Sequence, residues 1–114
     1  MGDLPDYTKY VINIPAPPSP ELVTNPKKYE GTVAVVGTPA TLNVNTDLGR
    51  NSGDGYIVCD GPGDLEVDLS DDGITFEEDI SIKENETFDL GGLNTHTIKI
   101  DATSNGTAYR VLVV

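Results

Sequence analysis

The sequence predicts an all-β protein, a single antiparallel β-sandwich or jelly roll of about eight strands. Short runs in which apolar and polar residues alternate recur along the chain, separated by clusters of Gly, Asn, Asp and Pro. These turn signals come roughly every 8–12 residues, which is typical of sandwiches and barrels. No stretch has a convincing helical period, and 114 residues fit one domain.

Residues 1–30 are predicted to form an extended arm. Most of the eight prolines lie here, and the run 15–20 favours polyproline II over helix. Before this linker, residues 7–14 alternate as a strand does. A strand tethered in this way pairs with another chain or folds back onto its own sheet. The arm residues predicted to contact a partner are Tyr7, Tyr10, Ile12 and Ile14.

The β-sandwich is predicted for residues 31–114. Its first strand is the apolar run 33–36, which Gly37, Thr38 and Pro39 interrupt. A second strand follows over residues 41–45, where apolar and polar side chains alternate. Residues 47–55 have the composition of an exposed loop.

The middle of the chain predicts a strand, a turn and a hairpin. Residues 56–60 form the strand, and Gly61-Pro62-Gly63 ends it. Residues 65–70 then alternate without error, with their apolar side chains on one face. Ser70-Asp71-Asp72-Gly73 is typical of a tight turn, and Ile80 and Ile82 belong to the strand that follows.

The last third of the chain predicts the remaining strands. Phe88, Leu90 and Leu93 come first, and residues 97–101 alternate around two isoleucines. In the final strand Tyr109, Val111 and Val113 share one face. The opposite face is apolar too, so this strand is either buried on both sides or lies at a subunit contact. The residues predicted to bind a partner there are Leu112 and Val114.

The charge of the chain limits its partners. The net charge is −12, and between Asp54 and Asp89 the only basic residue is Lys83. Such a surface repels phosphate backbones and anionic membranes, so we expect neither nucleic acid nor membrane as a partner. It suits cations or a basic protein, or serves only to keep the protein soluble.

The sequence offers no convincing catalytic set, so the protein is predicted not to be an enzyme and to need no cofactor. Cys59 is the only cysteine and lies in a run typical of a half-buried strand, which indicates a structural thiol. His96 is the only histidine and shares the parity of the neighbouring isoleucines, which indicates a structural role. Without a second histidine or a reactive cysteine, no nucleophile–base arrangement can be assembled.

One segment nearly matches a twelve-residue calcium loop. Asp68, Ser70, Asp72 and Asp79 would provide oxygen ligands at positions 1, 3, 5 and 12, with Gly73 at position 6. The flanking residues alternate as strands, whereas an EF-hand requires helices. We therefore expect a β-hairpin with a solvated turn and no metal. A wider group of acids is a second candidate for holding a cation between loops: Asp60, Asp64, Asp71, Asp72 and Asp79.

The C-terminal half resembles small accessory proteins of tailed bacteriophage particles. The residues that carry the resemblance are Asp64–Val67, Ser70–Phe76, Phe88–Leu93, Thr97–Ile100 and Ala108–Val111. It implies a non-enzymatic β-sandwich that decorates or stabilises a capsid through an extended arm and oligomer contacts.

The resemblance also implies the partners, which are a capsid or other virion protein and further copies of the chain, with a trimer expected. The N-terminus lacks the basic start and apolar core of a signal peptide, so we expect synthesis in the host cytoplasm and a final location in the virion. The alternative is a secreted β-sandwich module that binds calcium or a glycan.

Overall fold

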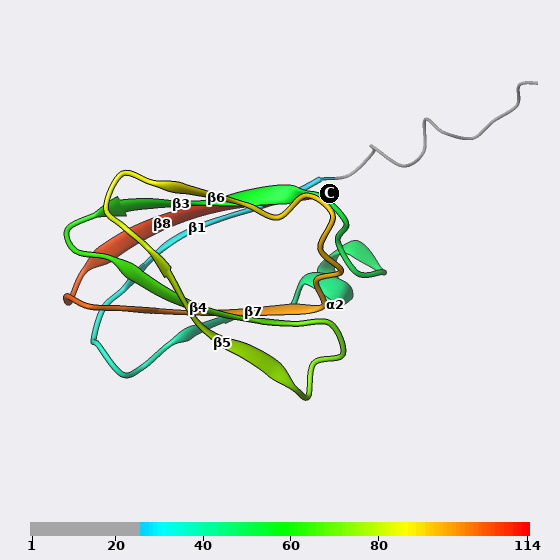
Figure 1. The fold of residues 1–114 in the computed structure, drawn as a ribbon, viewed down its shortest axis with the longest axis horizontal. Coiled ribbons are helices and arrows are strands. Elements are labelled where there is room, and N and C mark those ends of the chain that lie inside the picture. Colours follow the sequence, from blue (N-terminus) through cyan, green and yellow to red (C-terminus); the bar gives the residue numbers. More distant parts are fainter. Residues whose placement is uncertain (1–25) are drawn as a thin grey trace, which may run out of the picture.

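The computed structural model describes residues 26–114, which form eight strands and one short helix in two packed sheets (Figure 1). The first sheet contains, in order, β1 (Lys27–Val33), β8 (Thr107–Val113), β3 (Gly55–Gly61) and β6 (Thr87–Asp89). The second contains β2 (Ala40–Leu42), β7 (Thr97–Ala102), β4 (Leu65–Ser70) and β5 (Phe76–Ile82).

The strands pair in a nested order. β1 pairs with β8, β2 with β7, β3 with β6 and β4 with β5, all antiparallel. This is the pairing of one long hairpin that has been folded over. The pairs β3–β8 and β4–β7 then join its folded parts into two sheets. The arrangement is a jelly roll, so the predicted fold class is confirmed.

The core lies between the two sheets and follows the alternation in the sequence. Successive side chains of a strand point to opposite faces, so every second residue faces inward. The predicted inward faces of β4, β7 and β8 are confirmed by buried side chains at Leu65, Val67, Ile98, Ile100, Tyr109, Val111 and Val113. Leu90, from the connection between β6 and β7, is also fully buried.

The predicted start of the sandwich is wrong by four residues. β1 begins at Lys27, inside the segment assigned to the arm, and pairs along its whole length with β8. Of the predicted strand 33–36, only Val33 belongs to β1, and Val35 and Val36 are exposed. The cause is the composition of β1, which has charged residues and a glycine where a local pattern would need apolar ones.

The prediction that the chain contains no helix is also wrong. α2 (Val44–Leu48) is a single turn and occupies the end of the predicted strand 41–45 and the start of the predicted loop. Val44 and Leu48, four residues apart, both pack against the core. Gly49 ends the helix in a left-handed conformation, with φ of 80°, and its N–H donates to the carbonyl of Asn45.

β5 and β6 are the outer strands of their respective sheets, and each pairs with one neighbour. In Figure 1 they lie on the same side of the sandwich, each at the edge of its sheet, and the loop from β6 to β7 runs past one end of them. This arrangement of sheet edges positions the surface described next.

Candidate interaction surface

A groove of about 490 Å³ lies between β5 and β6; we call it the β5/β6 groove. Its lining comes from β4, β5, β6 and the loops after β4 and β6. The lining residues are Leu69, Ser70, Asp71, Thr75, Phe76, Glu77, Ile80, Phe88, Leu93, Asn94 and Thr95.

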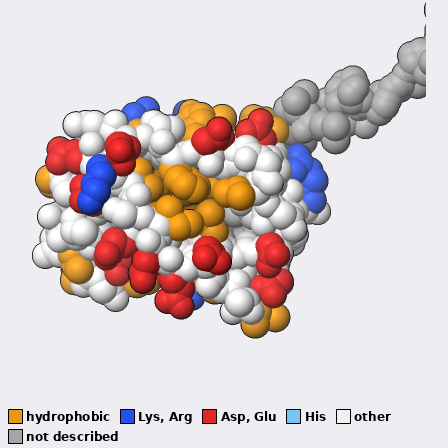
Figure 2. All heavy atoms as spheres, viewed as in Figure 1, with side chains coloured by type: hydrophobic (Ala, Val, Ile, Leu, Met, Phe, Trp, Pro, Cys, Tyr) orange, Lys and Arg blue, Asp and Glu red, His pale blue; other side chains and the backbone are white. Residues whose placement is uncertain are grey.

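The floor of the groove is apolar. Leu69, Ile80 and Phe88 pack against the core and yet remain partly exposed. Leu93 in the β6–β7 loop is 40% exposed. Figure 2 shows hydrophobic side chains gathered at the centre of this face, with Asp and Glu side chains around them. Core residues left open to water in this way are typical of a binding surface.

The rim of the groove is acidic. Asp71 and Glu77 belong to its lining, and Glu78 and Asp79 are exposed next to them on β5. Within residues 26–114 none of these four carboxylates forms an ion pair. The groove therefore combines an apolar floor with negative charge that favours a segment carrying a cation.

The structure brings the predicted contacts Leu112 and Val114 to a second hollow, on the outer face of the first sheet. This hollow measures about 430 Å³ and is also lined by Tyr56. Leu112 and Tyr56 are directly opposed across β8 and β3, and Tyr56 is 40% exposed. Tyr56 was not predicted as a contact. It lies on the face of β3 opposite the buried Ile57 and Cys59, and the local sequence does not show that this face is beside Leu112.

The predicted arm contacts Tyr7, Tyr10, Ile12 and Ile14 lie outside the described residues. The β5/β6 groove itself was not predicted. The sequence pattern identified its floor residues Leu69, Ile80, Phe88 and Leu93 only as apolar residues of successive strands. These residues are partly exposed because β5 and β6 are edge strands. The local sequence pattern does not predict which strands lie at the edges of the sheets.

The calcium-loop candidates form a hairpin turn instead. Asp72 Oδ1 accepts hydrogen bonds from the N–H of Ile74 (2.7 Å) and Thr75 (2.9 Å) and from the hydroxyl of Ser70 (3.0 Å). Ser70 Oγ in turn accepts from the N–H of Asp72 and Gly73. These oxygens are already used to hold the turn, and the predicted β4–β5 hairpin is confirmed.

The other two candidate ligands, Asp68 in β4 and Asp79 in β5, are joined by a hydrogen bond between the two strands. Asp68 Oδ1 accepts from the N–H of Asp79 at 3.0 Å, where β5 departs from regular pairing with β4. Asp79 has a φ of 63° at this irregularity. Gly73 has a φ of 81°, and a Cβ there would lie 2.7 Å from His96 Cε1, so the turn requires glycine at this position.

The structure does not gather the wider group of acids. Asp60 is held by Arg110 through two hydrogen bonds of 2.8 and 2.9 Å. These bonds hold the pKa of the Asp60 carboxyl below its usual value. Asp71, Asp72 and Asp79 lie instead around the β4–β5 turn and the adjoining part of β5. Within residues 26–114 no group of three His, Cys, Asp or Glu residues is placed to hold a metal ion.

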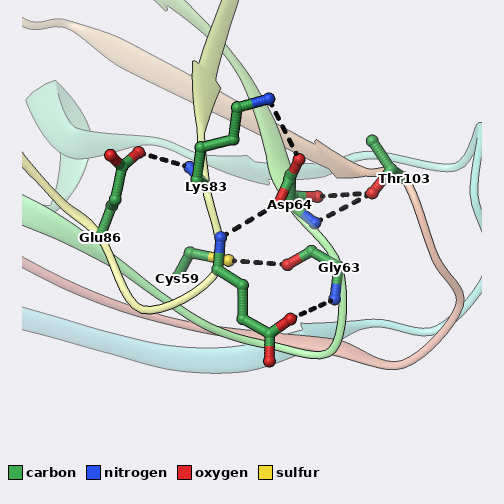
Figure 3. A network of polar contacts seen from close by, with 7 residues as sticks. Cys59, Gly63, Asp64, Lys83, Glu86 and Thr103 are labelled. Atoms are coloured by element: carbon green, nitrogen blue, oxygen red, sulfur yellow. Dashed lines mark hydrogen bonds and ion pairs between the residues drawn. The ribbon is translucent and has the colours of Figure 1, made fainter.

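Asp64 ties three loops together (Figure 3). Its Oδ1 accepts from the N–H of Glu84 at 3.0 Å, and its Oδ2 lies 3.4 Å from Lys83 Nζ. Its own N–H donates to Thr103 Oγ1 at 2.9 Å. The β3–β4, β5–β6 and β7–β8 connections therefore meet at this residue, which indicates a structural role.

Cys59 and His96 are placed as structural residues. The Cys59 side chain is fully buried, and its thiol donates to the carbonyl of Gly63 at 3.3 Å. Burial raises the pKa of the Cys59 thiol, which lowers the fraction of reactive thiolate. His96 is half-buried, and its Nδ1 lies 2.7 Å from the hydroxyl of its neighbour Thr97.

No family model matches the chain, and no curated protein or solved structure is significantly similar to it. Residues 26–114 contain no helix that is long and apolar enough to cross a membrane.

Proposed function

We propose that this protein is a non-enzymatic structural component of a bacteriophage particle, which decorates or stabilises the capsid. The observation that carries the proposal is the β5/β6 groove, an apolar opening into the core of an otherwise acidic jelly roll. A single domain that leaves core side chains exposed favours an assembly in which a neighbour covers them.

Two further features support an assembly role. The outer-face hollow exposes Tyr56 beside Leu112, so a second apolar surface lies on a different part of the same domain. Two separate apolar surfaces suit a subunit that contacts more than one neighbour. Jelly rolls also recur in viral capsid proteins, although the same fold occurs in lectins and cupins, so the fold alone does not decide between them.

The calcium-binding alternative receives less support from the geometry. Asp72, the central ligand of the candidate loop, already accepts three hydrogen bonds within its own turn. These three bonds all go to Oδ1, so the turn is held without a cation.

The test is quantitative mass spectrometry on purified phage particles from the source of the sequence. We expect the protein in a constant ratio to the main shell protein, unchanged after a high-salt wash that removes adsorbed proteins. Absence from particles while infected cells still produce the protein would overturn the proposal.

The contribution of the arm is tested with full-length variants added to particles that lack the protein. Ile12→Asp places a charge on the apolar side of the predicted arm strand, and we expect it to abolish binding to particles. Val11→Asp makes the same change on the other side of that strand and is the matched control. Equal binding of both variants would remove the arm from the proposal.

A further inference from the structure

The β5/β6 groove is the feature of the described residues that most needs a partner. Its apolar floor is continuous with the core through Leu69, Ile80 and Phe88, which are only partly covered. Both flanking strands pair on one side only. An extended segment laid between them could bury the exposed apolar surface and hydrogen-bond to a free strand edge, as in other strand-addition contacts.

We propose that the β5/β6 groove of one copy binds the arm segment Tyr7–Ile14 of a second copy. This inference rests on the proposed function and extends it by naming the partner of the arm. The occupant is chosen on three grounds: side-chain pattern, charge and reach.

The pattern of the segment fits the groove. Tyr10, Ile12 and Ile14 recur at every second residue, so they face one way in an extended strand. A strand lying beside β5 would direct these side chains into the apolar floor. Its outward residues would be Lys9, Val11 and Asn13.

The charge of the segment also fits. Residues 7–14 contain Lys9 and no acid, whereas the chain as a whole carries −12. The rim supplies Asp71, Glu77 and the neighbouring Glu78, none of which has an ion-pair partner within residues 26–114. This segment is therefore one of the few parts of the chain that the acidic rim would attract rather than repel.

The linker is long enough for the arm to reach a second copy. Eleven residues separate Ile14 from Pro26, and at about 3.1 Å per residue in polyproline II they would span on the order of 34 Å. β1 and β6 are opposite edges of one four-stranded sheet, only about 14 Å apart at a strand spacing of about 4.8 Å. A linker that can exceed this gap lets the segment reach beyond its own domain to a neighbouring copy.

The experiment is site-directed cross-linking between two full-length variants that differ in size through a tag. One carries Ile12→Cys and the other Leu93→Cys, at an exposed groove position. After mixing, a short bismaleimide is added; the native Cys59 is fully buried and stays unreactive. We expect the cross-linked heterodimer to exceed by several-fold that formed in two control mixtures.

The controls match chemistry and exposure. Val11→Cys replaces Ile12→Cys in the first, which moves the thiol to the other side of the arm strand. Val35→Cys replaces Leu93→Cys in the second; it is an exposed apolar position (55%) outside the groove. Equal cross-linking in all three mixtures would overturn the inference.

A chain carrying both Ile12→Cys and Leu93→Cys separates binding within a chain from binding between chains. Cross-linking confined to monomers at all concentrations would overturn the second-copy assignment. In sedimentation velocity, Leu93→Glu should lower the fraction of associated protein, and Val35→Glu should leave it unchanged. An unchanged fraction for Leu93→Glu would likewise overturn the inference.

These outcomes are distinguishable from failure of the proposed function. The protein could be present in particles at a constant ratio while Ile12→Cys and Leu93→Cys do not cross-link. That result would support the virion role and would mean that the arm binds another partner. Conversely, the two variants could cross-link specifically while the protein is absent from particles. That result would support self-association and overturn the virion role.

Discussion

At the scale of single residues, side chains that suggest chemistry serve instead to hold turns. Asp72 lies in an acidic run and matches a calcium ligand, but its carboxylate accepts two backbone N–H groups and one hydroxyl of its own turn. Asp64 does the same for three loops at the other end of the sandwich. Local hydrogen bonds of this kind are a common use of Asp in turns.

Replacing Asp72 should therefore weaken the hairpin. We expect Asp72→Ala to lower the melting temperature, and Asp71→Ala to change it little, because no hydrogen bond of the Asp71 side chain occurs within residues 26–114. Differential scanning calorimetry of both variants, with and without calcium, provides the measurement. Calcium-dependent stabilisation of the natural chain that Asp72→Ala removes would contradict the structural role.

The same carboxylate predicts a pH dependence. Hydrogen bonds from the N–H groups of Thr75 and Ile74 lower the pKa of Asp72 below its usual value. Because the folded-state pKa is lowered, the stabilisation is fully present above the unfolded pKa of about 3.9 and is lost as the pH falls through the folded value. In urea melts below pH 4, the difference between the natural chain and Asp72→Ala should shrink.

At the scale of elements, position relative to the two sheets decides what an apolar residue does. Leu90 and Leu93 lie three residues apart in the β6–β7 connection, and the sequence pattern does not distinguish them. Leu90 is fully buried, and its N–H donates to the carbonyl of Gly55 at 2.8 Å, whereas Leu93 is 40% exposed at the groove. Leu90 therefore belongs to the folded core, whereas Leu93 is available for contact with a partner.

These two leucines make a matched pair for mutation. We expect Leu90→Ala to lower the free energy of unfolding by about 2–5 kcal/mol, because it leaves a cavity in the core. Leu93→Ala should cost less than about 1 kcal/mol, since its side chain is already partly in water. Urea denaturation of both variants tests this, and equal losses would mean that Leu93 belongs to the core.

β1 and α2 show where a local pattern is insufficient. β1 has a weak strand pattern, yet seven residues pair in register with β8, which supplies the hydrogen bonds and the apolar face. Residues 44–48 continue an alternation that began at Thr41, yet they form a helical turn that packs Val44 and Leu48 on the core. In both cases contacts with distant strands override the local preference.

At the scale of the whole molecule, charge opposes association while the groove favours it. Each copy carries −12, so two copies repel at long range. The groove contact proposed here is mainly apolar, so screening weakens only the part of it that comes from Lys9 and the acidic rim. Salt therefore acts on the repulsion more than on the contact.

Association between copies should accordingly strengthen as salt is added. The screening length falls from about 30 Å at 0.01 M to about 8 Å at 0.15 M, which removes most of the repulsion between exposed charges. Sedimentation velocity at the two salt concentrations gives the fraction of associated protein. A steady decrease with salt would mean that attraction between Lys9 and the acidic rim outweighs the repulsion between copies.

The sequence by itself determined the fold class, the inward faces of β4, β7 and β8, and the hairpin at Ser70–Gly73, because a period of two and a turn signal are properties of neighbouring residues. Only the tertiary structure decided that β5 and β6 would be the edges left side by side. That outcome depends on pairings such as β1 with β8 and β3 with β8, between residues far apart in the chain. The β5/β6 groove therefore exists as a consequence of strand order, and the residues that line it carry the same local pattern as residues of the closed core.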